Sequence, residues 1–393
     1  MPKVTVLSST GNAMVSQAFR QAEPDVVAAY PITPQTTIIE GFAKFVADGD
    51  VRTEFVPTES EHSAMSACIG ASAAGARVAT ATSSQGLALM WEELYIAAGM
   101  RLPIVLANAN RALSSPINIG ADHGDIMGVR DSGWIILMAE NAQEAYDNSL
   151  MAFRIAEDPR IQNPVCTSLD GFVTTHAMER CELLDDESVK AFVGGRTPEH
   201  ALLDLDNPVG MGMYANSQPY IEAKQAQRLM MNSAQPVIQE IGDEWEKVCG
   251  RPFKTVDTWG MEDAEKAIVI LGSCAGNARA VAKRLRAKGE KVGVVRVRLF
   301  RPFPAKDVAE ALSGVKAIAV LDRTEAMGAQ FAPLAEDVCS ALYSAGLQIP
   351  LKNYLYGLGG TDITLDMLEG VYHDLDDVAA GKIDSSIKYL GTR

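Results

Sequence analysis

Two carboxylates and a histidine stand at the start of an otherwise small and apolar segment. The stretch VPTESEHSAMSACIGASAAGARVATATSSQG begins with Glu59, Glu61 and His62, and small side chains dominate the rest. Such groups can act as proton donors or acceptors. A local explanation competes with this one. TEFVPT is typical of a strand, and a helix is expected from about Thr58 to Gly75, with Thr58 and Glu61 forming its capping box.

A second candidate site combines Thr33 and Arg111. In YPITPQT two prolines stiffen a loop that presents Thr33, and NANRALSSP leaves a later strand with Arg111 as its only charged residue. An arginine beside a threonine is suited to bidentate capture of a carboxylate. The alternative for Arg111 is a surface or inter-subunit ion pair.

The elements that must position these residues alternate along the first half of the chain. Strand-length apolar runs such as KVTVLS, VVAAYPIT, RVATATS, LPIVLANAN and PVCTSLDG are separated by amphipathic helical patterns. This alternation predicts an α/β fold in which a parallel sheet, beginning with KVTVLS, is covered on both faces. The candidate loops follow strands, and open parallel sheets bind ligands at the C-terminal ends of their strands.

Changes in composition divide the chain into three parts. The first α/β domain is predicted over residues 1–185, and a polar arm with a long linker helix over 186–261. That helix, IEAKQAQRLMMNSAQPVIQEIGDEWEKVCG, is expected to break or bend near Pro236. A second, smaller α/β domain is predicted over residues 262–393.

Composition excludes several classes of function. The net charge of −15 argues against a nucleic-acid partner. No apolar run approaches the length of a membrane span, and the N-terminus lacks the pattern of a signal peptide, so a cytoplasmic protein without membrane contact is expected. The six cysteines are far apart and form no CxxC, which excludes an iron–sulfur cluster or zinc ribbon built by this chain alone.

Phosphate-binding motifs are weak or missing. GSCAGNAR (272–279) follows a strand and opens a helix, but it and GLGGTD (357–362) match no strong phosphate-loop pattern. GDG followed about twenty-five residues later by Asn, the usual Mg-diphosphate signature of thiamine enzymes, does not occur. Any diphosphate must therefore be held elsewhere. His123, between Asp122 and Asp125, is expected to be a structural hydrogen-bonding residue, and no metal site is predicted on this chain.

Several of these motifs occur in an order that resembles a known family. YPITPQT, ESEHSAMSACIGASAAGARVATATSSQGLALM, NRALSSPINI, DHGDIM, RDSGW, LDGF and LFRPFP together resemble the α subunit of four-subunit pyruvate:ferredoxin oxidoreductases. The resemblance covers nearly the whole chain. It implies a pyrimidine-type (PYR-type) domain of a thiamine diphosphate enzyme, a linker helix and a transketolase-C-like domain. LFRPFP is then expected to be a scaffold and subunit-contact element.

The resemblance also implies roles for individual residues. Glu61 would hydrogen-bond the N1′ nitrogen of the coenzyme's aminopyrimidine and so promote loss of the thiazolium C2 proton, with Glu59 as the local alternative. Thr33 and Arg111 would bind the carboxylate of a 2-oxo acid. The run of Ser84, Gln85 and Gly86 would line the coenzyme site.

The implied partners follow from the same resemblance. A β subunit would hold Mg and the diphosphate, a γ subunit would complete the complex, and a ferredoxin-like δ subunit would carry [4Fe-4S] clusters. Coenzyme A would accept the acyl group, and external ferredoxin or a similar acceptor would take the electrons.

One pair departs from the expected pattern. Gly120 and Ala121 stand before Asp122 and His123, where the pyruvate enzymes carry a large aromatic residue and an asparagine. If this loop faces the substrate, the pocket is enlarged for phenylglyoxylate, indolepyruvate or a branched 2-oxo acid. If it faces an interface, the change carries no information on specificity. Pyruvate is the first prediction, and a non-redox thiamine transferase or decarboxylase subunit and a non-catalytic scaffold are the rival classes.

Overall fold

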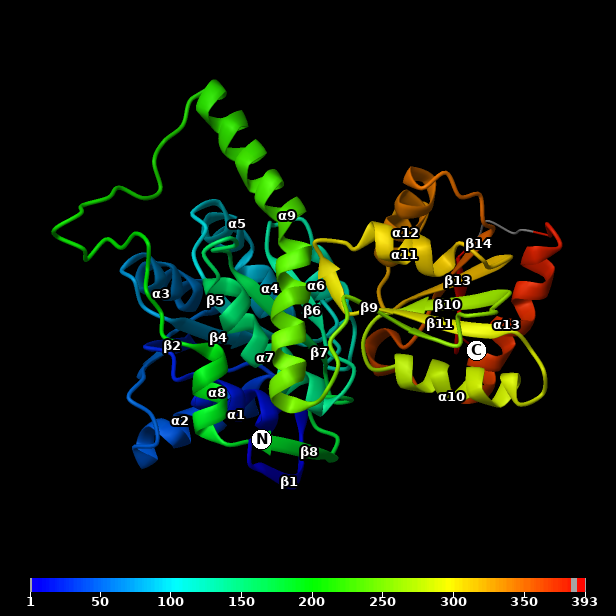
Figure 1. The fold of residues 1–393 in the computed structure, drawn as a ribbon, viewed down its shortest axis with the longest axis horizontal. Helices are drawn as coiled ribbons and strands as arrows, with labels where there is room; N and C mark the ends of the chain where they lie inside the picture. Colours follow the sequence, from blue (N-terminus) through cyan, green and yellow to red (C-terminus); the bar gives the residue numbers. More distant parts are fainter. Residues whose placement is uncertain (1, 383–386, 393) are drawn as a thin grey trace.

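The computed structural model describes residues 2–382 and 387–392, and its core consists of two mainly parallel sheets side by side (Figure 1). The first sheet has seven strands in the order β12-β6-β7-β5-β4-β2-β3, and the second has six in the order β15-β14-β13-β10-β11-β9. The predicted α/β fold with two parallel sheets is confirmed.

The first sheet contains the strands that precede the candidate loops. Its parallel strands are β2 (Val26–Ala29), β3 (Glu54–Pro57), β4 (Val78–Thr82), β5 (Ile104–Asn110), β6 (Ile135–Met138) and β7 (Val165–Asp170). Most of these strands are buried along their whole length, as expected for a sheet covered on both faces.

Helices cover both faces of the first sheet. One face packs against α1 (Gly11–Ala22), α2 (Thr36–Asp48) and α7 (Ala142–Glu157), with α8 (Asp186–Val193) and α9 (Ser217–Cys249) outside them. The other face packs against α3 (Glu61–Ala73), α4 (Ser84–Leu89), α5 (Trp91–Gly99) and α6 (Gly124–Gly128). The second apolar cluster continues into the second sheet, so the two halves share a core.

The second sheet forms the smaller half. Its strands are β9 (Val256–Trp259), β10 (Lys266–Ile270), β11 (Val292–Val297), β13 (Ala317–Asp322), β14 (Leu351–Leu355) and β15 (Lys388–Tyr389), with only the β9–β11 pair antiparallel. Helices α10 (Ala275–Arg286) and α13 (Leu365–Ala379) cover one face, and α11 (Ala305–Leu312) and α12 (Pro333–Ser344) the other. A 3₁₀ turn, η1, spans Leu358–Gly360.

Two local predictions need correction. KVTVLS does form a strand, β1 (Val4–Ser9), but it pairs antiparallel with β8 (Glu179–Leu184) outside the main sheets and is largely exposed. The linker helix α9 is not broken at Pro236, but Figure 1 shows it bent partway along its length, which is one of the two expected outcomes. The first eight residues of the expected arm form α8, so the irregular segment is 194–216. Figure 1 shows that segment extending past α3 before it returns to the start of α9.

The LFRPFP motif ties the two halves together. Its strand β12 (Leu299–Arg301) leaves the second half of the chain and pairs antiparallel with β6 at the edge of the first sheet. Strand β9 likewise lies within the predicted linker yet pairs in the second sheet. The domain limits 1–185, 186–261 and 262–393 stay predictions.

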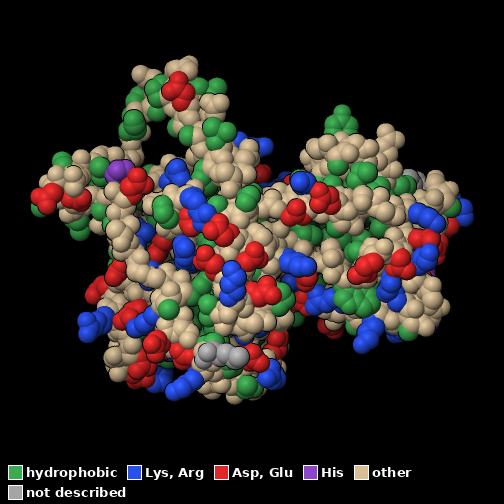
Figure 2. All heavy atoms as spheres, in the orientation of Figure 1, with side chains coloured by type: hydrophobic (Ala, Val, Ile, Leu, Met, Phe, Trp, Pro, Cys, Tyr) green, Lys and Arg blue, Asp and Glu red, His purple; other side chains and the backbone are tan. Residues whose placement is uncertain are grey.

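On the face drawn in Figure 2, acidic and basic side chains are interspersed. Within the described parts of the chain, none of the helices has both the length and the apolar content that crossing a bilayer requires.

Candidate active site

Glu61 is a buried carboxylate at the end of the loop that follows β3. It is the first residue of α3, directly after β3, and it is 6% exposed. Among the described residues, nothing donates a hydrogen bond to its carboxylate or pairs with it. Buried polar groups are almost always satisfied, because leaving one unpaired costs free energy. Within the described residues, the Glu61 carboxylate is therefore available to bind a group from outside this chain.

The start of α3 differs from the prediction. Ser60, not Thr58, is the N-cap, and its side chain accepts a hydrogen bond from the Ser63 backbone N–H. Thr58 Oγ1 instead donates to the backbone oxygens of Ala29 and Ser60. Because the helix begins later, Glu61 lies in its first turn with a free side chain and forms no capping box with Thr58.

Gly86 and Thr82 form a close-packed wall beside Glu61. A Cβ atom added to Gly86 would lie 2.6 Å from Oε1 of Glu61 and 2.4 Å from Oγ1 of Thr82. Thr82 is fully buried, and its Oγ1 has no hydrogen-bond partner within the described chain. Thr82 was not among the residues singled out from the sequence. Only its place at the end of β4, immediately before SSQG, could have indicated it.

The other predicted residues of this loop adopt a constrained conformation. Ser84 is fully buried, and its φ of +51° lies in the left-handed region that non-glycine residues rarely adopt. Its Oγ lies 2.6 Å from both the Ala112 carbonyl oxygen and Oε1 of Gln85. Gln85 is half-buried. The loop is held by hydrogen bonds to the neighbouring strand connection, and strained residues of this kind occur often at functional sites.

Thr33 and Arg111 lie together, as their predicted shared role requires. One terminal nitrogen of Arg111 donates to the Thr33 carbonyl oxygen at 2.9 Å, and Nε donates to the Asn118 carbonyl oxygen at 3.3 Å. Arg111 is 7% exposed, and no carboxylate pairs with it among the described residues. A buried guanidinium bound only to neutral carbonyls keeps its charge available for an anion.

Asp125 connects the coenzyme loop with the substrate loop. Its Oδ2 accepts hydrogen bonds from the backbone N–H of Ser84 at 2.9 Å, that of Arg111 at 3.1 Å and the side-chain amide of Asn108 at 3.1 Å. Burial raises the pKa of Asp125 to about 6, and these hydrogen bonds partly oppose the rise. The sequence had shown Asp125 only as a neighbour of His123, because its contacts join residues from three separate segments.

Gly120 and Ala121 pack against the second half of the chain. A Cβ atom on Gly120 would lie 2.2 Å from the carbonyl oxygen of Gly359, and the Gly360 N–H donates to the Ala121 oxygen at 2.9 Å. A tryptophan at position 120 would therefore have to displace the 357–360 turn. Their role in specificity stays a prediction.

Glu59 and His62 point away from the buried carboxylate. Glu59 is exposed and accepts a hydrogen bond from Ser63 Oγ, which lowers the pKa of Glu59. His62 Nε2 lies 2.8 Å from Oε1 of Glu92 and 3.2 Å from Oε1 of Glu93. These contacts are those of a solvated helix start and a surface ion pair.

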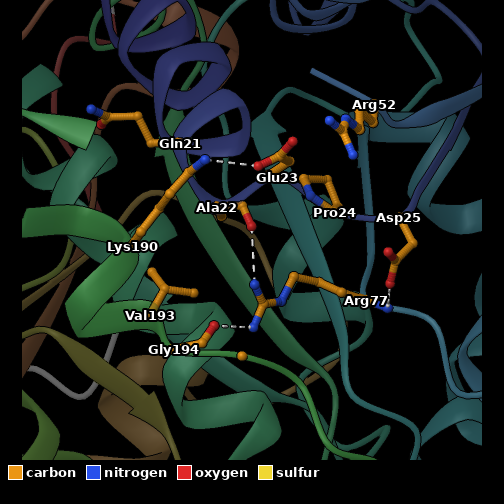
Figure 3. A pocket seen from close by; sticks show the side chains of 11 residues that line it. Gln21, Ala22, Glu23, Pro24, Asp25, Arg52, Arg77, Lys190, Val193 and Gly194 are labelled. Atoms are coloured by element: carbon orange, nitrogen blue, oxygen red, sulfur yellow. Dashed lines mark hydrogen bonds and ion pairs between the residues drawn. The ribbon is translucent and has the colours of Figure 1, made fainter. Parts of the chain in front are cut away.

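A separate cavity of about 400 Å³ lies at the opposite edge of the first sheet (Figure 3). It is lined by residues that precede β2 and β4, including Asp25 and Arg77, whereas Glu61 and Ser84 follow strands β3 and β4. Figure 3 shows Lys190 directed at Glu23, and Arg77 directed at the carbonyls of Ala22 and Gly194. Arg77 is also paired with Glu157, so its charge is already neutralised.

Comparison with known families identifies the group to which the chain belongs. Residues 17–243 match the family described as "Pyruvate flavodoxin/ferredoxin oxidoreductase, thiamine diP-bdg". Residues 264–368 match "Pyruvate:ferredoxin oxidoreductase core domain II". The chain belongs to the pyruvate flavodoxin/ferredoxin oxidoreductase family. The resemblance predicted from the sequence motifs is confirmed.

Relatives in this family are similar along the whole length. Pyruvate synthase subunit PorA of Thermotoga maritima is 50% identical over 98% of this chain and 97% of its own. The corresponding PorA of Methanocaldococcus jannaschii is 42% identical over 98% and 97%. Ketoisovalerate oxidoreductase subunit VorA of Pyrococcus horikoshii is also 42% identical, over 97% and 96%.

Solved structures support the fold. A 2-oxoglutarate:ferredoxin oxidoreductase from Magnetococcus marinus superposes with a TM-score of 0.71 at 21% identity, covering 94% of this chain and 65% of that one. A split-gene transketolase superposes with a TM-score of 0.55 at 13% identity, covering 94% and 97%.

The residues around Glu61 fit the thiamine diphosphate of this oxidoreductase family. The cradle combines an unpartnered buried carboxylate, the unpartnered hydroxyl of Thr82, and Gly86, where a side chain would fill the space. Bound there, the coenzyme would supply the carbanion chemistry that cleaves the bond between a carboxylate and a carbonyl carbon. Glu61 would then face a ring nitrogen of the coenzyme, and the missing side chain of Gly86 would leave room for the ring.

The hydrogen bonds of Asp125 predict a pH dependence of turnover. Below about pH 6, protonation of Asp125 would weaken three hydrogen bonds that position Ser84, Asn108 and Arg111, so kcat/KM should fall. The pKa is higher in the folded than in the unfolded chain, so this group favours the native state as pH falls from about 6 to 4. Activity should therefore fall as the pH drops below about 6, while protonation of Asp125 causes no fall in Tm.

Profiles of kcat/KM and Tm from pH 5 to 8 test this expectation in the assembled complex. The groups that donate hydrogen bonds to Asp125 are neutral amides. Among nearby titratable side chains, the buried Cys166 thiol has its pKa raised by burial and by the charge of Asp125. Asp125→Asn should flatten the acid limb of the profile. An unchanged acid limb in that variant would assign the titration to another group.

Proposed function

We propose that this chain is the α subunit of a CoA-dependent 2-oxoacid:ferredoxin oxidoreductase, with pyruvate as its substrate. The reaction converts pyruvate and CoA to acetyl-CoA and CO₂ and passes two electrons to an acceptor. The observation that carries the proposal is the buried, unpartnered Glu61 beside Gly86, in a chain 50% identical to a pyruvate synthase subunit.

Each proposed site residue has a distinct task. Glu61 holds the proton exchanged with the aminopyrimidine ring, and Ser84, Gln85 and Gly86 line the coenzyme. Arg111 binds the carboxylate of the 2-oxo acid, and Thr33 completes that pocket. Holding both reactants in one place lowers the entropic part of the barrier.

The chain supplies only half of the proposed centre. A β subunit holds Mg and the diphosphate, because the chain lacks the GDG-to-Asn signature. The [4Fe-4S] clusters lie on other subunits, including a ferredoxin-like δ subunit, because the six cysteines of this chain are unpaired and scattered. A γ subunit completes the complex, and external ferredoxin or a similar acceptor takes the electrons.

Exposed apolar side chains support assembly with partners. The 194–216 segment exposes Leu203, Leu205, Met213 and Tyr214, each at least 73% accessible. Apolar side chains are visible on the projecting part of the molecule in Figure 2. Large exposed apolar side chains gathered on one segment favour an interaction surface.

A bulkier 2-oxo acid is the alternative substrate. The ketoisovalerate oxidoreductase subunit VorA of P. horikoshii is as similar to this chain as some pyruvate synthase subunits are. Phenylglyoxylate, indolepyruvate and branched 2-oxo acids are therefore the compounds to compare with pyruvate.

A substrate panel tests the proposal. The purified complex is assayed for CoA-dependent reduction of ferredoxin with pyruvate, 3-methyl-2-oxobutanoate, phenylglyoxylate and indolepyruvate. Pyruvate should give the highest kcat/KM. A higher value for a bulky acid would select the alternative substrate, and CoA-dependent turnover of none of them would overturn the proposal.

Arg111→Lys should raise KM for every 2-oxo acid by about tenfold or more. Lysine keeps the charge but loses the planar fork that binds a carboxylate through two parallel hydrogen bonds, each worth about 1.5 kcal/mol or more. KM for CoA should stay unchanged, and the same assay measures both. A substrate ranking altered by this variant would mean that Arg111 contacts more than the shared carboxylate.

A further inference from the structure

Arg111 is positioned by a short loop. The Ala112 N–H donates to the Gly120 oxygen at 3.1 Å, and the Gly120 N–H donates to Asn118 Oδ1 at 2.6 Å. These bonds close the loop and direct the Asn118 carbonyl toward Nε of Arg111, at 3.3 Å. The orientation of the guanidinium thus depends on where residues 118–121 are held.

The far end of this loop is bonded to the second half of the chain at three consecutive residues. Ala121 accepts from the Gly360 N–H at 2.9 Å, Asp122 Oδ2 accepts from the Gly359 N–H at 3.3 Å, and the His123 N–H donates to the Arg323 oxygen at 2.8 Å. Gly359 and Gly360 belong to η1, and Arg323 directly follows β13. The position of the loop therefore depends on residues of the second half of the chain and not only on the first sheet.

A buried charge cluster fixes this part of the second half to the first sheet. Asp170 lies at the end of β7, and its Oδ1 is 2.6 Å from His123 Nε2. Its Oδ2 accepts a hydrogen bond from Arg323 Nη1 at 3.0 Å and another from Ser273 Oγ at 2.6 Å. Burial would raise the pKa of Asp170, but His123, Arg323 and Ser273 together hold it well below its usual range. Asp170 Oδ1 also lies 3.4 Å from the side-chain amide of Asn110, the residue before Arg111.

We propose that Arg323 is a positioning residue for the substrate-binding Arg111, acting through Asp170 and the 120–123 segment. This inference rests on the proposed function of the same site. Arg323 touches no reacting group. It holds in place the residues of the second half that bond residues 121–123. In this way the second half of the chain helps to orient Arg111, which binds the substrate carboxylate in the first half.

Arg323→Gln in the assembled complex tests the inference. KM for pyruvate should rise roughly 10- to 100-fold, the range that follows a misplacement of about 1 Å, while KM for CoA stays unchanged. Binding of oxamate, an unreactive analogue of pyruvate, should weaken by the same factor in calorimetry. In the Arg111→Lys background the effect of Arg323→Gln should fall to less than about twofold, because both changes remove the same interaction.

Arg284→Gln provides the matched control, since Arg284 makes partly exposed ion pairs with Asp366 and Glu369 on the same half of the chain. Arg284→Gln should change neither KM for pyruvate nor KM for CoA. Unchanged pyruvate KM in Arg323→Gln, or effects that multiply with Arg111→Lys, would overturn the inference.

A milder variant covers failure of assembly. If Arg323→Gln does not assemble, Ser273→Ala, which removes one hydrogen bond to Asp170, decides by the same criteria. A parent complex that oxidises no 2-oxo acid would overturn the proposed function, whereas normal parent turnover with insensitive variants would overturn only the role of Arg323.

Discussion

Replacing Glu61 by glutamine should lower turnover of the assembled complex by about 10²–10⁴-fold, the usual contribution of a general acid–base group. Glutamine keeps the shape of the side chain but cannot take up or release the proton. The buried carboxylate has no hydrogen-bond or ion-pair partner to lose in the part of the chain that the structure describes, so stability should stay the same or rise. Rates with pyruvate and CoA, together with size-exclusion profiles, measure both expectations.

Glu59→Gln is the matched control, two residues away. Glu59 is exposed and bonded to Ser63, so its loss should change turnover by less than about twofold. A larger loss from Glu59→Gln than from Glu61→Gln would show that the catalytic carboxylate has been assigned to the wrong residue.

The isolated chain should neither turn over nor bind thiamine diphosphate tightly. Its half of the proposed centre offers Glu61, Thr82 and Gly86 for the aminopyrimidine. Its sequence lacks the GDG-to-Asn signature that holds Mg and diphosphate in thiamine enzymes. Loss of two or more charge-assisted contacts weakens binding by about 100-fold or more. Calorimetry with Mg and thiamine diphosphate, on this chain alone and on the complex, measures the difference.

The complex carrying Glu61→Gln serves as the control for that titration. It should bind the coenzyme more tightly than the isolated wild-type chain, because the partner's contacts are intact. Stoichiometric, tight binding by the isolated chain would refute the division of the site between two subunits.

Local patterns in the sequence predicted most of the fold and the grouping of the site residues. Strand-length apolar runs predicted the parallel sheets because buried strands need no polar alternation. Loops at the ends of those strands then had to meet at one edge, which is why Thr33 and Arg111 are in contact. The errors arose where local signals competed, as with Ser60 and Thr58 for the N-cap of α3.

The remaining features depend on contacts between distant segments. β1 looked like a core strand, yet it pairs with β8, more than 170 residues later. The three hydrogen bonds to Asp125 Oδ2, and the contacts of the Asp170 side chain with four residues, join positions that no spacing rule relates. Gly120 was recognised as unusual, but only the three-dimensional structure shows Gly359 directly against it.

The most direct test of the account follows the fate of the carboxylate carbon. Pyruvate labelled at C1 is incubated with CoA, Mg, thiamine diphosphate, ferredoxin and the complex reconstituted with or without this chain. Labelled CO₂ and acetyl-CoA should form in equal amounts, with two electrons transferred per CO₂, only when this chain is present. Equal release of labelled CO₂ without this chain, or none with it, would contradict the assignment of Glu61 to a shared oxidative decarboxylation centre.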